Sequence, residues 1–84
     1  METLITATSE VKHDNGCTEI TFSDGVITWY KHNKLHREDG PASIYPDGTV
    51  FWYFDGLICT FNHWCVLAMV SPRLKFDLMM QYGD

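Results

Sequence analysis

Two groups of residues in this chain have the types that enzymes and metal sites use. His36, Arg37, Glu38 and Asp39 are consecutive, and an imidazole beside two carboxylates can perform general acid–base chemistry. The second group consists of imidazoles and thiols, which are zinc ligands. Its members are His13, Cys17, Cys59, His63 and Cys65. Four of these five side chains could form a tetrahedral site that holds a small domain together.

The spacing of these residues argues against both kinds of chemistry. Structural zinc sites usually contain two cysteines separated by two residues, and this chain has no such pair. Cys65 follows His63 by two positions, and side chains at that separation on a helix point apart. We therefore expect no catalytic residue, no metal ligand and no cofactor. A zinc-stabilised adaptor remains an alternative.

Turn signals recur along the first 56 residues and separate short runs rich in β-branched and aromatic residues. Such runs joined by Asx-Gly turns are typical of β-hairpins, because glycine and asparagine tolerate positive φ. The expected strands are the runs TEITF, VITWY, ASIY, TVFWYF and LICTF. Asp39-Gly40-Pro41 then serves as a chain reversal, which gives the His36–Asp39 stretch a structural role.

The hairpins repeat with an offset of 23 residues. A unit of this length is one hairpin and cannot bury its own face, so neighbouring copies must stack. Because side chains alternate along a strand, Trp29 and Trp52 fall on matching faces, and we expect them to stack on each other. The aligned pairs are Asp24 with Asp47, Gly25 with Gly48, Trp29 with Trp52, Tyr30 with Tyr53, Asn33 with Gly56, and His13 with His36.

Helix signals replace turn signals in the last third of the chain. Asn62 is expected to cap a helix over 63–70. Ser71 followed by Pro72 predicts a second helix over 72–81, which ends at Gly83. Apolar residues at helical spacing form a stripe on this second helix: Leu74, Leu78 and Tyr82, with Met79 beside them. We expect the two helices to cover the second copy, whose strand is apolar on both faces.

The expected fold class is α+β, a twisted antiparallel β-hairpin meander of about six strands capped by two short C-terminal helices. One domain is expected over residues 1–84, with the meander in 1–60 and the helical cap in 61–84. A domain of this length buries only about 60% of its unfolded surface and needs a dense core. Three Trp, four Tyr and five Phe can supply that core.

The motif HREDGPA at 36–42, with the pattern DGxxxWY at 24–30, resembles the HREDGPA-type repeats of bacteriophage and giant-virus proteins, a variant of MORN-type repeats. The ending from Trp52 to Gly83 resembles a tail that follows such repeats in small phage proteins. The resemblance covers roughly residues 22–83, and the second copy has lost the HREDGPA motif. It implies antiparallel hairpins and a non-enzymatic accessory protein that acts on a host factor.

The charge distribution limits the classes of partner. The net charge is −5 and the six basic residues are scattered, which argues against clustered contacts to nucleic-acid phosphates and against a polybasic membrane patch, so we expect neither nucleic acid nor membrane as a partner. The chain opens without a positively charged segment and has no long apolar run, so we expect neither a signal peptide nor a membrane span. With three cysteines taken as reduced thiols, the expected location is the host cytoplasm.

These observations predict a small phage-type protein that binds a host protein and inhibits or redirects it, for example as an anti-CRISPR-like inhibitor, without catalysis. The predicted contact residues are Tyr30, His32, Lys34, His36, Arg37, Tyr45, Phe54 and Trp64, with Met69, Met79 and Met80 as further candidates. The alternative in a different class is a homo-oligomeric structural or assembly accessory protein. It depends on an open sheet edge in residues 4–22, through which a homodimer could form.

Overall fold

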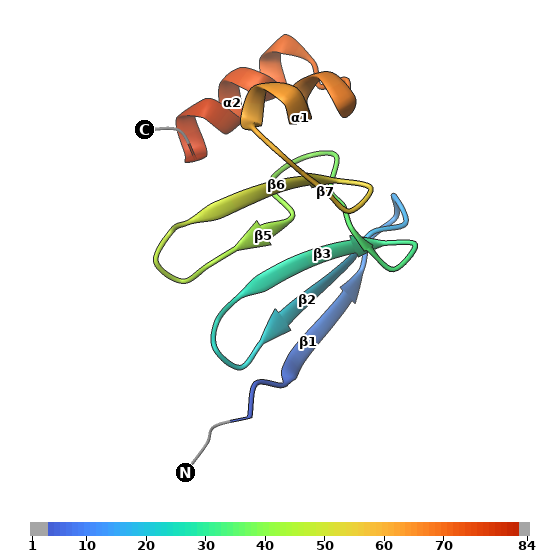
Figure 1. Cartoon of the computed structure of the whole chain (residues 1–84), viewed down its shortest axis with the longest axis vertical. Coiled ribbons are helices and arrows are strands. Elements are labelled where there is room, and N and C mark those ends of the chain that lie inside the picture. Colours follow the sequence, from blue (N-terminus) through green and yellow to red (C-terminus); the bar gives the residue numbers. More distant parts are fainter. Residues whose placement is uncertain (1–3, 83–84) are drawn as a thin grey trace.

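The computed structural model describes residues 4–82. Within this range seven strands form an antiparallel sheet, and two helices follow it (Figure 1). The elements are β1 (Ala7–Lys12), β2 (Thr18–Phe22), β3 (Ile27–Lys31), β4 (Lys34–Leu35), β5 (Ser43–Ile44), β6 (Val50–Phe54), β7 (Leu57–Cys59), α1 (Phe61–Leu67) and α2 (Pro72–Tyr82). The α+β class and the antiparallel meander with two C-terminal helices are confirmed.

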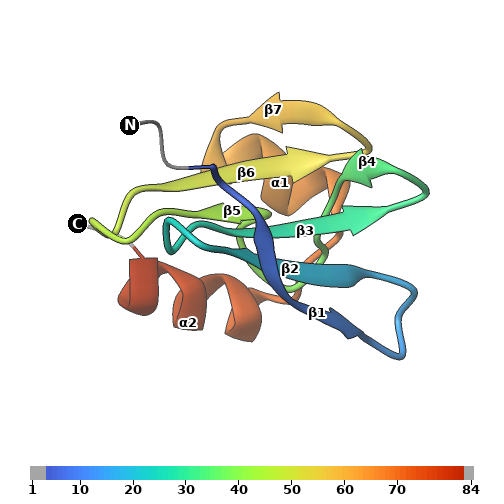
Figure 2. The ribbon, with the colours of Figure 1, turned by 90° about the horizontal axis from the view of Figure 1, so that it is seen from below.

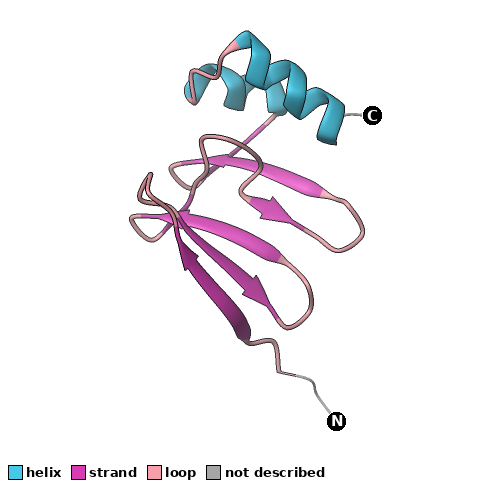
Figure 3. Cartoon of the chain, turned by 180° about the vertical axis from the view of Figure 1, so that it is seen from behind, coloured by secondary structure: helices cyan, strands magenta, loops and turns pink. Residues whose placement is uncertain are grey.

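The sheet places β1 far from the two helices. The strand order is β1-β2-β3-β5-β6-β7, and β4 pairs with β3. The helices lie together at the β6–β7 end, and β1 is at the opposite end (Figure 3). β1 runs obliquely to β2 and β3, because the sheet is strongly twisted (Figure 2). Among the described residues, no helix is long and apolar enough to cross a membrane.

The 23-residue offset recurs in the hydrogen bonds of the turns. The turn before β3 is closed by Asp24, whose Oδ1 accepts the amide of Val26 at 3.1 Å. In the turn before β6, Oδ1 of Asp47 accepts the amide of Thr49 at 2.9 Å. Positive φ recurs at the same offset, at Gly25 and Gly48, His32 and Asp55, and Asn33 and Gly56. Two adjacent left-handed residues form the hairpin turns that match the strand twist.

The first helix begins two residues earlier than the sequence predicts. Thr60, not Asn62, is its N-cap, and Thr60 Oγ1 accepts the amide of His63 at 3.2 Å. The expectation for Asn62 was wrong because β7 ends at Cys59, so the chain is free to turn into a helix at the next residue. Both residue types can cap a helix, and the end of the strand decides between them.

The second helix begins as predicted. Ser71 Oγ accepts the amide of Leu74 at 3.1 Å, and Pro72 is the first helical residue. The predicted end at Gly83 lies outside the described residues. Leu78 is buried and Leu74 and Tyr82 pack beside it, which confirms the apolar stripe. Met79, the fourth member, remains 51% exposed.

The core consists of two clusters. The cap cluster joins β6 to both helices and contains the buried residues Trp52, Trp64, Cys65 and Leu78. The first-copy cluster contains the buried residues Cys17, Trp29 and Ala42, with Ile27 and Tyr53 packed against it. The prediction that the helices cover the second copy is therefore confirmed.

The two repeat tryptophans do not stack on each other, so that prediction was wrong. Ala42 lies between their strands, because its carbonyl accepts the amide of Trp29 at 2.8 Å and its amide donates to the Phe51 carbonyl at 3.0 Å. Trp29 stacks instead on the ring of His13, with centroids 4.4 Å apart. Trp52 belongs to the other cluster, and each tryptophan therefore has its own cover.

Candidate functional site

The HREDGPA link, residues 36–42 between β4 and β5, begins with a buried imidazole. His36 is 2% exposed, its Nδ1 accepts the amide of Asp55 at 2.9 Å, and its Nε2 donates to Glu38 Oε2 at 2.8 Å. Acceptance of this amide by Nδ1 places the ring proton on Nε2, and Asp55 Oδ1 lies 3.3 Å from Nδ1. The hydrogen bond from His36 lowers the pKa of Glu38 below its ordinary value of 4.5. Both ring nitrogens are used inside the fold, which leaves neither free to act as a general base.

Arg37 covers the ring of Trp29. The centre of its guanidinium lies 3.9 Å from the ring centroid, a cation–π distance. Its Nε donates to Asp39 Oδ1 at 2.7 Å, and another guanidinium nitrogen donates to the Pro41 carbonyl at 3.1 Å. These contacts make Arg37 part of the scaffold and hold the HREDGPA link against β3.

Two of the three thiols, those of Cys17 and Cys65, are protected by the fold. Burial raises the pKa of Cys17, whose Sγ donates to the His36 carbonyl at 3.8 Å, and burial also raises the pKa of Cys65. A buried thiol with a raised pKa is protonated at neutral pH and reacts poorly. The two thiols lie in different core clusters, and no three His, Cys, Asp or Glu side chains in residues 4–82 converge to hold a metal ion. The zinc alternative has no ligand set there.

Two of the predicted contact residues are core residues. Trp64 is 0% exposed, and its Nε1 donates to the Arg37 carbonyl at 2.8 Å. His36 is enclosed as described above. Their assignment to a binding surface was wrong, because α1 turns Trp64 inward and the link encloses the imidazole. Phe54 is half-buried and packs on His36 with ring centroids 4.5 Å apart.

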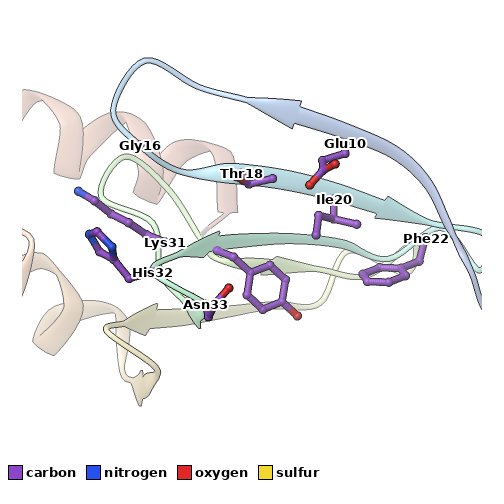
Figure 4. A pocket seen from close by; sticks show the side chains of 9 residues that line it. Glu10, Gly16, Thr18, Ile20, Phe22, Lys31, His32 and Asn33 are labelled. Carbon is purple, nitrogen blue, oxygen red and sulfur yellow. The ribbon is translucent and has the colours of Figure 1, made fainter.

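Three predicted contact residues lie at the tip of the β3–β4 hairpin. His32 and Lys34 are exposed and Tyr30 is half-buried. A groove of about 420 Å³ runs from this tip along β2 (Figure 4). Lys31, His32 and Asn33 are at one end and Phe22 is at the other (Figure 4). The groove is lined by Glu10, Gly16, Thr18, Ile20, Phe22, Tyr30, Lys31, His32 and Asn33.

Tyr45 is the last predicted contact residue and is 38% exposed. Its ring meets the ring of Phe51 edge to face, with centroids 5.6 Å apart. This pair spans the turn between β5 and β6, where both rings are accessible to solvent. Tyr45 is therefore available for contact, unlike Trp64.

The helical cap exposes more large apolar side chains than the sequence stripe suggests. We use the name outer cap surface for these exposed side chains, which come from α1, α2 and the turn between them: Val66, Met69, Phe76, Met79 and Met80, with exposed fractions of 73%, 87%, 61%, 51% and 72%. Sequence reasoning named the three methionines and missed Val66 and Phe76. A helical projection could have found Phe76 and Met80, since both lie opposite the buried Leu78. An apolar pocket of about 110 Å³ opens beside Met79 and is lined by Trp52, Phe61, Leu78, Met79 and Tyr82.

Met69 occupies a backbone position that favours glycine. It follows α1 with φ 52°, its amide donates to the Val66 carbonyl at 3.2 Å, and the amide of Val70 donates to the Cys65 carbonyl at 3.2 Å. This pair of hydrogen bonds is the Schellman ending, in which the left-handed residue is usually glycine. A large apolar side chain is thus held in solvent on a strained backbone.

Comparison with known proteins returned no match: no family model, no curated protein and no solved structure resembles the chain closely enough to be matched.

Proposed function

We propose that this protein is a binding module whose outer cap surface contacts a host protein and inhibits or redirects it, without catalysing a reaction. The main support for the proposal is that Met69 combines a left-handed backbone with an exposed apolar side chain. Its left-handed backbone costs roughly 1–2 kcal/mol for a residue with a side chain. Its side chain is 87% exposed and so contributes little to the fold. A contact with a partner explains why a large apolar residue stands where glycine fits better.

The other members of the outer cap surface support the same proposal. Phe76 and Met80 project from the side of α2 opposite the buried stripe, where a helix that contacts only solvent normally carries polar residues. Methionine and aromatic side chains are enriched at protein interfaces. The apolar pocket beside Met79 offers a place for an apolar anchor of the partner. The net charge of −5 would accelerate association with a basic partner face.

The resemblance of the HREDGPA repeat and its helical tail to small phage proteins supports a host protein as the target. The repeated turn hydrogen bonds support a MORN-like reading of the strands, which would serve as the scaffold for the cap. A location in the host cytoplasm belongs to the same proposal. On this view the hairpin tip and Tyr45 form a second, smaller contact area.

The test compares charge substitutions at matched positions in the helical cap. Four tagged proteins are used to capture partners from a bacterial lysate: wild type, Met69→Glu, Met80→Glu and Asn62→Glu. The captured partner is then purified, and its affinity for each of the four proteins is measured by titration. Asn62 is exposed in the first turn of α1, where an added negative charge is favourable, so Asn62→Glu is the control. We expect wild type and the control to bind equally, and both methionine variants to bind at least about tenfold more weakly. Equal binding by all four proteins, or no stoichiometric partner for any of them, would contradict the proposal.

A further inference from the structure

The outer edge of β1 is open. All six residues of β1 are exposed, and among residues 4–82 only β2 pairs with this strand. An edge strand presents a row of free amide and carbonyl groups that can pair with another strand. The register of β1 shifts between Ala7 and Ser9, so regular pairing is confined to the part of the strand that follows. This edge is at the opposite end of the molecule from the helical cap (Figure 1).

The register with β2 decides which main-chain groups point outward. The amide of His13 donates to the Cys17 carbonyl at 2.8 Å, and Val11 pairs with Glu19 two residues further along the same ladder. Main-chain groups in an antiparallel ladder alternate in direction along the strand. The main-chain amide and carbonyl of Val11 therefore point toward β2, and the main-chain amides and carbonyls of Glu10 and Lys12 point away from it.

The charges of these two outward-pointing residues select one way to pair the edge with itself. Two copies of β1 can pair antiparallel with Glu10 opposite Glu10, with Lys12 opposite Lys12, or with Glu10 opposite Lys12. Like charges directly opposite each other are destabilising and opposite charges are stabilising. Only the third arrangement places a carboxylate opposite an ammonium group at both positions. It places Val11 opposite Val11 on a two-fold axis, as a closed symmetric dimer requires.

We propose that the protein forms a symmetric dimer in which β1 pairs with β1 of a second copy, centred on Val11. The occupant of the open edge is thus a second copy of this chain, chosen by charge complementarity. The two sheets become one continuous sheet, and the two grooves that contain Glu10 lie on the same face of it. The proposal is independent of host binding, because the outer cap surface stays free at both ends.

The first test exchanges the charges. Sedimentation equilibrium gives the dimer Kd of four samples: wild type, Glu10→Lys, Lys12→Glu, and an equimolar mixture of the two variants. Circular dichroism is the control for folding. Each single variant places like charges opposite each other twice, and we expect it to weaken the dimer by about tenfold. In the mixture, a Glu10→Lys chain meets a Lys12→Glu chain with opposite charges at both positions, and we expect wild-type affinity. A monomeric wild type, or single variants that dimerise as well as wild type, would overturn the proposal.

The second test locates the two-fold axis. In the proposed pairing the two Val11 Cα atoms face each other at about 4.5 Å, within reach of a disulfide. The Ser9 positions of the two copies are about 13 Å apart along the strands, beyond that reach. We expect Val11→Cys to give a covalent dimer on mild oxidation and Ser9→Cys to give none above the wild-type background. A covalent dimer of Ser9→Cys without one of Val11→Cys would refute this register.

Discussion

Trp29 and Trp52 occupy the same place in two copies of one unit, yet they are covered in different ways. Over Trp29 lies the guanidinium of Arg37, held by a carboxylate and a carbonyl of the same link. Over Trp52 lie the rings of Phe61 and Trp64 from α1, with centroids 4.8 and 4.7 Å away. Trp29 also stacks on the ring of His13. The cover that the Arg37 link adds is polar and made by a loop, whereas the cover of Trp52 is aromatic and made by a helix.

The difference shows that the strand and its cover are specified separately. At the 23-residue offset Arg37 corresponds to Thr60 and Glu38 to Phe61, so the residues that build a polar link in one copy start a helix in the other. The turns and strands before them remain equivalent. A change of a few residues after the second strand is therefore enough to replace a loop by a helical cap over the same tryptophan position.

The largest expected effect comes from removing either tryptophan. Trp29→Ala and Trp52→Ala should each lower the free energy of unfolding by about 3–5 kcal/mol, because each leaves a cavity in a buried cluster. Trp52 contacts three other aromatic rings, so we expect its loss to be the greater of the two. Urea denaturation of both variants measures the difference. Wild-type stability of Trp29→Ala would show that the polar cover is dispensable.

The covers themselves can be compared at matched positions. Arg37→Ala removes the cation–π contact and two hydrogen bonds and should cost about 2 kcal/mol. Thr60→Ala removes only the N-cap of α1 and should cost about 1 kcal/mol. Chemical denaturation gives both values, and Arg37→Lys serves as the control that keeps the charge and loses the planar fork. If Thr60→Ala were the more damaging, the N-cap of α1 and not the guanidinium would make the larger contribution to stability.

The end of α1 differs from the hairpin turns, where positive φ falls on glycine, asparagine, aspartate or histidine and not on an apolar residue. Met69→Gly should stabilise the protein by about 0.5–1 kcal/mol, because glycine adopts φ > 0 without steric cost. The matched control Met80→Gly lies within α2 and should destabilise by about 1 kcal/mol. Thermal melting shows whether each variant raises or lowers the stability of the protein. A destabilised Met69→Gly would mean that the side chain supports the fold, against the proposed contact role.

The smallest expected effect is the pH dependence of the polar cover. The pKa of Glu38 is lowered in the folded protein by its hydrogen bond from His36, relative to its ordinary value of 4.5. Its stabilising contribution is therefore fully present above the unfolded value and is lost as pH falls through the folded pKa. The side chain is 43% exposed, so solvent screening keeps the contribution below about 1 kcal/mol.

Glu38→Gln tests this expectation. Urea midpoints of wild type and variant, measured from neutral to acidic pH, should differ most above the unfolded pKa and converge below the folded one. Phe61, the matching residue of the second copy, does not titrate, so the aromatic cover should show no comparable dependence. A constant difference between the two proteins at all pH values would assign the effect of Glu38 to packing.

Most features coded by neighbouring residues could be predicted from the sequence, although the N-cap of α1 was not, and several features that depend on distant residues could not be predicted. The Asp-Gly turns, the strand TEITF and the Ser71-Pro72 helix start each depend on contacts within a few positions, and the structure has all of them. The separation of Trp29 from Trp52 depends on Ala42, which pairs with both neighbouring strands.

The same distinction between local and distant contacts applies to the predicted contact residues. The exposure of the β3–β4 tip and of the methionines follows from local position, and it was predicted. The burial of His36 depends on the amide of Asp55, 19 positions away, and that of Trp64 on the carbonyl of Arg37. A one-dimensional pattern contains no information about these partners, so both residues were assigned to the surface.

The equivalence of the two turns bears on how the gene for this protein can change. Each turn is closed by residues of its own unit: Asp24 serves the first and Asp47 the second. An in-frame duplication of one unit therefore copies everything that its turns need, and neither the β1 edge nor the helical cap has to change with it. The length of such a chain can evolve in whole units between two fixed ends, while point mutations can change those ends without altering the repeat.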